Sequence, residues 1–243
     1  MPGPLAAPAV VAVLLLLLPL IGLLVRAPWG SLMSIVGNPE VLAALRLSLW
    51  TATAATVVSL LVGGPLAWVL ARASLPGIGV LRALVTLPLV LPPVVGGVVL
   101  LLAFGRQGIL GRWLDAWFGV TIPFTPAAVV LAQTFVAMPF LVITVEGALR
   151  SADRGFEEAA ATLGASRMTI LARVTIPMIA PSLVAGSVLC WARALGEFGA
   201  TITFAGSLPG RTQTMPVAVY YALEREPDAA IVLSLVLLMV SLA

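Results

Sequence analysis

Two residues of opposite charge stand inside a long apolar stretch in the last quarter of the chain. Arg193 and Glu197 are four residues apart within residues 178–204. This spacing places both side chains on one face of a helix. A charge inside a bilayer costs at least about 2.5–3.5 kcal/mol, so the pair should face a helix bundle or a water-filled path.

Two interpretations of this pair remain open. It could line a pore, with Arg193 offsetting the charge of a passing anion, or it could be a buried ion pair that only holds helices together. Neighbouring glycines allow another helix to approach closely, and threonines offer hydroxyl groups. Binding in a conducting path must be weak enough for release. The candidate path residues here are Arg193, Gly196, Glu197, Gly199 and Thr201.

A charged segment, residues 150–177, lies between two apolar stretches, and its first part predicts a helix over residues 153–163. Asp153 can cap the start, where the helix dipole also favours Glu157 and Glu158. Helical spacing collects the less polar residues on one face. That face consists of Phe156, Ala159, Ala160 and Leu163.

The second part of the charged segment predicts a break and another short helix. Gly164 can end the first helix in the left-handed conformation. Ser166 can cap a second helix running to Arg173, and Pro177 then starts the next membrane span. The segment is too short and too charged to cross a bilayer. It suits either docking into a groove on a partner or lying on the membrane surface.

The composition is that of a membrane protein. Of 243 residues, 61% are hydrophobic and 9% charged, and the mean hydropathy is +1.15. Soluble domains carry about 25% charged residues. Most of this chain should therefore be surrounded by lipid. We expect one membrane domain over residues 1–243, with no room for a separate soluble enzyme.

The residue types that are missing exclude several kinds of site. All 13 basic residues are Arg, and the chain has neither Lys nor His. A phosphate-binding P-loop lacks its Lys, and a Ser-His-Asp triad or a His metal site cannot be built. Cys190 has no second cysteine to pair with. The scattered Arg residues form no nucleic-acid-binding stripe. We expect no catalytic residue, metal or cofactor in this chain.

The apolar runs predict an all-α protein with six membrane spans, each needing about 20 residues. They cover residues 9–25, 47–70, 83–104, 127–146, 178–204 and 229–243. The first lacks the basic start of a signal peptide and is expected to be a retained helix. The sixth is short, so it begins nearer Tyr220 or is incomplete at Ala243.

Prolines interrupt the third run at residues 87–93, which include Pro92 and Pro93. Proline kinks a helix by removing a hydrogen-bond donor. A packing kink and a gate or pore role both remain open for these two residues. Arg counts on the two sides of the predicted membrane are equal, so charge alone does not orient the chain.

The charged segment resembles the coupling loop of ABC-importer permeases, E-A-A-x-x-x-G followed after nine residues by I-x-L-P. Glu158, Ala159, Ala160 and Gly164 match, and Pro177 stands at the right distance. Val174 and Ile176 replace the Ile and Leu of the pattern. The resemblance implies that residues 150–177 are cytoplasmic, that both termini are cytoplasmic, and that the loop transmits closure of a partner ATPase. The coupling residues would be Phe156, Glu157, Glu158, Ala159, Ala160, Leu163, Gly164 and Pro177.

Two further stretches resemble permeases for molybdate. One is residues 87–97 with residues 104–108, and the other runs from Arg193 to Glu224. Sulfate permeases share the Gly-Glu-Phe-Gly part at residues 196–199. The resemblance implies a homodimer in the cell membrane, two ATPase subunits that hold ATP and Mg, and an external oxyanion-binding protein. Tungstate and sulfate remain alternatives as substrates.

Residues 206–214 fall on the outer side under this topology. The side chains that could receive the binding protein or shape an outer vestibule are Arg211, Thr212, Gln213 and Thr214. Ordinary loop chemistry explains them too. The rival classes are an ion-coupled secondary transporter and an intramembrane enzyme. The first usually has internal repeats and several midplane acids, and the second needs catalytic bases that this chain lacks.

Overall fold

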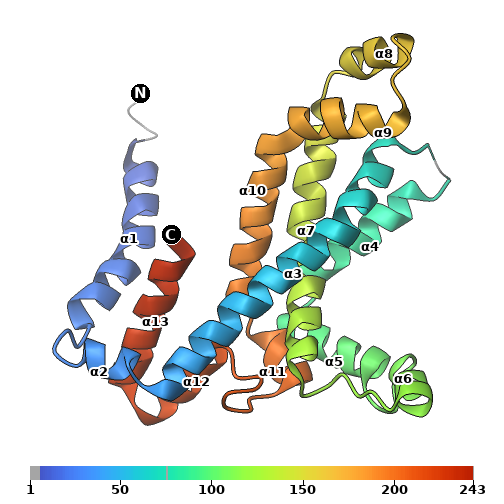
Figure 1. The fold of residues 1–243 in the computed structure, drawn as a ribbon. Helices are drawn as coiled ribbons and strands as arrows, with labels where there is room; N and C mark the ends of the chain where they lie inside the picture. The colour runs from blue at the N-terminus through green and yellow to red at the C-terminus, as the bar shows by residue number, and fades with distance from the viewer. Residues whose placement is uncertain (1–5, 75, 243) are drawn as a thin grey trace.

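A computed structural model describes residues 6–74 and 76–242, and these residues form helices and connecting turns without a strand. Figure 1 shows the arrangement. The helices are α1 (Ala6–Arg26), α2 (Leu32–Val36), α3 (Pro39–Arg72), α4 (Ile78–Val90), α5 (Pro93–Phe104), α6 (Gly111–Phe118), α7 (Pro126–Ser151), α8 (Gly155–Thr162), α9 (Arg167–Ile170), the π-helical turn η2 (Leu171–Thr175), α10 (Ile176–Leu195), α11 (Gly199–Ala205), α12 (Met215–Arg225) and α13 (Pro227–Leu242). The predicted all-α class is confirmed.

Helix α7 is the centre of the bundle. It packs along α3 and α10, and its N-terminal half contacts α5 and α11. Small residues make this close packing possible, because Ala52 and Ala55 of α3 and Ala137 of α7 are fully buried. Leu141, also on α7, is buried in the same core. Helices α3, α7 and α10 therefore form the central bundle, against which α4, α5 and α11 pack.

The described residues contain four helices long and apolar enough to cross a membrane, namely α1, α3, α7 and the continuous helix from Arg167 to Leu195. A fifth span results if α4 and α5, bent by 119°, count together. The sixth candidate, α13, has 16 residues. Its start near Tyr220 is wrong, since α12 ends at Arg225 and Pro227 opens a new helix. The predicted last residue, Ala243, lies outside the described residues.

The predicted fifth span, residues 178–204, is wrong at both ends. The helix ends at Leu195, and α11 begins only at Gly199. At the other end, α9, η2 and α10 are continuous, so Pro177 lies inside the helix rather than at its start. In η2 the amide of Ile176 bonds to the carbonyl of Leu171, five residues back. This wider turn carries the helix past a proline that has no amide donor.

The bundle has two distinct ends. Figure 1 shows α8 and α9 at one end, and α5, α6, α11 and α12 at the other. Helices α1 and α13 lie beside each other, away from α7, and α12 links α13 to α3. Figure 1 shows that α1 begins toward the α8 end, and that α13 runs from the α12 end in the same direction but stops about halfway.

Candidate functional site

The charged segment folds as a helix, a glycine turn and a second helix. The Asp153 carboxylate accepts a hydrogen bond from the Gly155 amide at 2.8 Å. Gly164 has φ of +85°, a conformation that favours glycine. The Ser166 hydroxyl accepts from the Thr169 amide at 3.2 Å. The predicted pattern of two helices and a glycine turn is confirmed, but the predicted cap is wrong by one residue. The first helix spans Gly155–Thr162 with Arg154 at its N-cap position, so Asp153 stands just before the cap. The second helix continues into α10.

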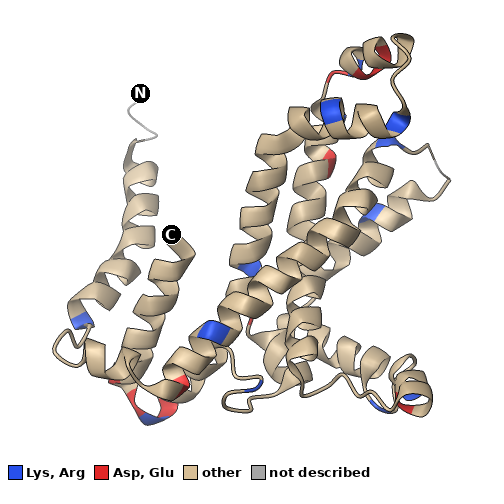
Figure 2. Ribbon diagram, viewed as in Figure 1, with Lys and Arg blue, Asp and Glu red and all other residues tan. Residues whose placement is uncertain are grey.

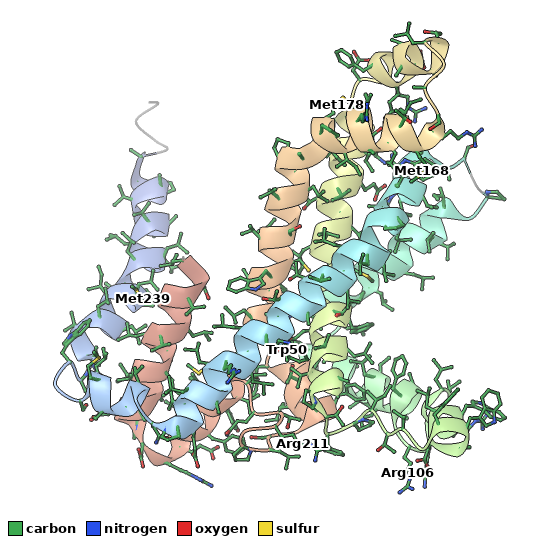
Figure 3. The ribbon with its side chains drawn as sticks, viewed as in Figure 1. Trp50, Arg106, Met168, Met178, Arg211 and Met239 are labelled. Atoms are coloured by element: carbon green, nitrogen blue, oxygen red, sulfur yellow. The ribbon has the colours of Figure 1, made fainter. Side chains whose placement is uncertain are left out.

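Apolar side chains of this segment project away from the bundle. Phe156 is 62% exposed and Leu163 is 88% exposed. Met168 on α9 is 72% exposed, and Figure 3 shows it at the same end as α8. Glu158 and Ala159 are exposed, and Ala160 is partly exposed. An exposed surface that combines apolar side chains with charged ones fits a groove on another protein.

Glu157 points the other way, into the bundle. Its Oε1 lies 2.9 Å from Nη2 of Arg72 on α3 and accepts from the Thr175 hydroxyl at 2.9 Å. The neighbouring carboxylates of Glu157 and Glu158 therefore have different surroundings. Sequence reasoning missed Arg72, because 85 residues separate it from Glu157 and no local pattern links them.

A second ionic cluster lies at the same end of the bundle. Glu146 on α7 is 6% exposed and accepts from Arg82 at 2.8 Å and from Arg150 at 2.9 Å. Arg150 also donates to the carbonyl of Leu70 at 3.0 Å. The cluster ties together α3, α4 and α7. Figure 2 shows that charged residues gather at the two ends of the molecule and are sparse along the helices between them.

The predicted Arg193–Glu197 pair forms, but it lies where the helix is interrupted between α10 and α11 rather than inside one continuous helix. Arg193 Nη1 lies 2.6 Å from Glu197 Oε2. The other oxygen, Oε1, accepts from the Ala200 amide at 2.8 Å, in the first turn of α11. Glu197 is 1% exposed. The carboxylate thus compensates Arg193 and satisfies an amide that has no partner inside its own helix.

The break after α10 packs against the break between α4 and α5. A Cβ on Gly199 would lie 2.6 Å from the Cβ of Pro93, and one on Gly97 would lie 2.6 Å from the Cβ of Thr203. Only glycine permits this contact. Sequence reasoning gave close packing as a reason for Gly196 too, but a Cβ there would meet only ordinary contact.

A cavity of about 140 Å³ adjoins this contact. Arg193 lines it together with residues of α4, α5 and α7, among them Pro93, Gly96 and Phe135. Thr201, predicted to offer a hydroxyl, is buried, and its Oγ1 has no hydrogen-bond partner in the described structure. Pro92 caps the start of α5. The two stretches that stood out in the sequence therefore meet beside one cavity, whose lining is apolar except for Arg193.

The predicted outer loop lies at the end opposite α8. Arg211 is exposed and Gln213 is partly exposed, whereas Thr212 and Thr214 are buried. The Thr212 hydroxyl accepts from the Leu208 amide at 3.0 Å, so it shapes the loop itself. Only Arg211 and Gln213 of the four side chains can reach a partner directly.

The segment 61–243 matches the family described as the binding-protein-dependent transport system inner membrane component. The chain belongs to this family. It is 50% identical over 234 residues to the molybdenum transport system permease protein ModB of Mycobacterium tuberculosis (strain ATCC 25618 / H37Rv), covering 96% of this chain and 88% of the relative. It is 42% identical to ModB of Escherichia coli (strain K12), covering 86% and 93%.

The permease is also similar to the sulfate transport system permease protein CysT of Escherichia coli (strain K12), at 36% identity over 92% of this chain and 82% of the relative. Its fold resembles a bacterial ABC transporter involved in alginate import, with a TM-score of 0.73 at 18% identity, covering 97% and 88%. The inward-facing MetNI methionine ABC transporter gives 0.60 at 19% identity, covering 84% and 92%. The chain is a multi-pass permease subunit of an ABC transporter.

Proposed function

We propose that this chain is the pore-forming subunit of an ATP-driven importer that carries molybdate across the cell membrane. The observation that carries the proposal is the exposed helix α8. Glu158 and Ala159 are exposed on it, and the left-handed Gly164 ends the turn that follows it. An apolar, uncovered surface at one end of a membrane bundle is what a cytoplasmic motor subunit would need.

The working complex would contain two copies of this chain, with the path between them, and two ATPase subunits docked on α8 and α9. The ATPases would hold ATP and Mg, and this chain would hydrolyse nothing. An oxyanion-binding protein would dock at the opposite end, near Arg211 and Gln213. Both termini would then be cytoplasmic. Closure of the ATPases would move the α8 helices together and switch the path from inward-facing to outward-facing.

The chemistry beside the cavity supports a doubly charged tetrahedral anion as cargo. Arg193 brings a guanidinium to the cavity wall, where Glu197 forms an ion pair with it. A cation held in an ion pair attracts an anion more weakly than a free cation does, and weak binding allows release. Two relatives that are 50% and 42% identical to this chain are named molybdenum transport system permease proteins.

The proposal is tested by uptake of labelled molybdate into vesicles that contain the chain, its ATPase and its binding protein. Glu158→Ala and Gly164→Pro should abolish ATP-dependent uptake and weaken the complex, because proline cannot adopt the φ of +85° found at residue 164. Gly164→Asn is the matched control, since Asn tolerates the left-handed region, and it should retain uptake. Uptake that ignores ATP and follows an ion gradient would favour a secondary transporter instead.

Sulfate is the second candidate cargo, because the CysT relative is 36% identical over 92% of the chain. Tungstate is a third, as a tetrahedral dianion of similar shape. Unlabelled anions added to the same vesicles separate them. Competition by tungstate but not by sulfate would support the molybdate group. Stronger competition by sulfate than by molybdate itself would reassign the cargo.

A further inference from the structure

Glu157 has contacts that differ from those of every other residue on α8. Among the described residues, its carboxylate makes the only side-chain hydrogen bonds that join α8 to the long helices. One partner is Arg72, in the last turn of α3, and the other is Thr175, where η2 meets α10. Both partners are well buried, with side-chain exposure of 9% for Arg72 and residue exposure of 3% for Thr175.

Apart from these two hydrogen bonds, α8 makes few contacts with the bundle. It packs against α9 and η2, its neighbours in the sequence. The apolar side chains of Phe156 on α8 and of Leu163 directly after it are exposed and contribute little to packing. The two bonds of Glu157 are therefore the direct polar link from α8 to the last turn of α3 and to the junction of η2 with α10.

The place where Glu157 is attached is itself rigidly held. Arg150 donates to the Leu70 carbonyl, two residues before Arg72, and Arg150 and Arg82 both bind Glu146. The last turn of α3 is thus fastened to α4 and α7. A displacement of Arg72 would move these three helix ends together, because they are linked by partly buried charge-assisted hydrogen bonds.

We propose that Glu157 is a positioning residue that couples α8 to the transport path, whereas the exposed Glu158 faces the partner. This inference rests on the proposed function for the role of α8. Movement of α8 would pass through Glu157 to Arg72 on α3 and to Thr175 at the head of α10. Helix α10 leads to Arg193 at its other end, beside the cavity.

The first test measures the attachment without any transported substrate. The chain has no Lys, so trypsin cuts only after Arg, and Arg154 and Arg167 flank α8 in exposed positions. In the purified full-length chain, Glu157→Ala removes the acceptor of both hydrogen bonds, so it should speed cleavage at these two sites several-fold, because the loop opens more often. Equal cleavage rates for wild type and variant would overturn the attachment.

The second test separates coupling from folding in vesicles with the ATPase and binding protein. Glu157→Gln should lower ATP-driven uptake about tenfold while ATP hydrolysis and complex assembly persist. The double variant Arg72→Met/Glu157→Gln removes the buried unpaired cation, so it should regain thermal stability but not uptake. Recovery of uptake together with stability would mean that the pair only neutralises charge, and the inference would fail.

Asp115→Asn is the matched control, since it removes the Arg106–Asp115 ion pair (2.9 Å) at the other end of the molecule, where Figure 3 labels Arg106. Arg106 is largely exposed, and its hydrogen bond to Asp115 and the charge of Asp115 raise its pKa. The control should leave loop cleavage and uptake unchanged. A wild-type complex that shows no ATP-driven uptake would instead refute the proposed function, and the cleavage test would still judge the attachment.

Discussion

The carboxylate of Glu197 is held at both of its oxygens. Oε2 pairs with Arg193 at 2.6 Å, and Oε1 accepts from the Ala200 amide at 2.8 Å. Glu157 is likewise shared, between a guanidinium and a hydroxyl. In both cases the acid satisfies a buried donor in addition to a cation, which is how a buried charge becomes tolerable. A single substitution at either pair therefore leaves a group unpaired.

Arg193→Ala should destabilise the folded chain by about 3–5 kcal/mol, because it leaves the buried Glu197 carboxylate without its cation. Arg193→Met/Glu197→Gln should recover most of that loss, since Gln can still accept from the Ala200 amide. Unfolding of the detergent-solubilised chain measures both. Transport by the stable double variant then distinguishes the two functions of the pair: retained uptake indicates a lock between helices, and lost uptake indicates a role in the path.

Among the secondary-structure elements, two interrupted helices contact each other. Helices α4 and α5 are bent by 119°, and α10 and α11 are separated by residues 196–198. Gly97 on α5 and Gly199 on α11 allow these broken segments to touch. Backbone groups left free at such breaks are tolerated in a membrane only where protein or a cavity receives them. The contact lies beside the cavity that Arg193 lines.

Gly97→Ala should cost about 1–3 kcal/mol of stability, because the added Cβ would lie 2.6 Å from the Thr203 Cβ and 2.9 Å from the Ala200 carbonyl oxygen. Gly64→Ala on α3 is the control, since nothing lies within 4 Å of a Cβ built there. Thermal unfolding of the two variants side by side measures the difference. Equal stability of the two would contradict the close packing of α5 on α11.

The whole molecule is a bundle with two ends of different character. One end carries α8 and the ionic clusters of Glu157 and Glu146. The other carries α6, α11, α12 and the exposed Arg211. Helix α1 has no buried residue, so its apolar surface is available to lipid or to a second copy. A chain with these two ends can bind different partners on the two sides of a membrane.

We expect the α8 end to be cytoplasmic and the Arg211 end to be external. In a Cys190→Ser background, Leu163→Cys and Arg211→Cys each provide one exposed thiol. An impermeant maleimide added to intact cells should label residue 211 readily and residue 163 only after permeabilisation. The reverse pattern would invert the topology and remove α8 from any cytoplasmic ATPase.

Local features of this protein follow from the sequence alone. The helical class, the turn at Gly164, the capping by Ser166 and the bond of Asp153 to the Gly155 amide depend on residues within a few positions of one another. The Arg193–Glu197 pair is also local, since its members are one turn apart. The same reasoning identifies α8 as a helix that is not a span, because its charge and length forbid crossing.

Only the tertiary structure decided the rest. The link between Glu157 and Arg72 spans 85 residues, and the contact between Pro93 and Gly199 joins two breaks that are distant in the chain. The helix boundaries around Pro177 and Leu195 also differ from the prediction. The π-helical turn η2 accommodates Pro177 within a continuous helix, and residues 196–198 interrupt the helix before α11, whose first turn donates to Glu197. Such contacts depend on which helix faces pack together, and a hydrophobic pattern marks a membrane span without specifying its neighbours.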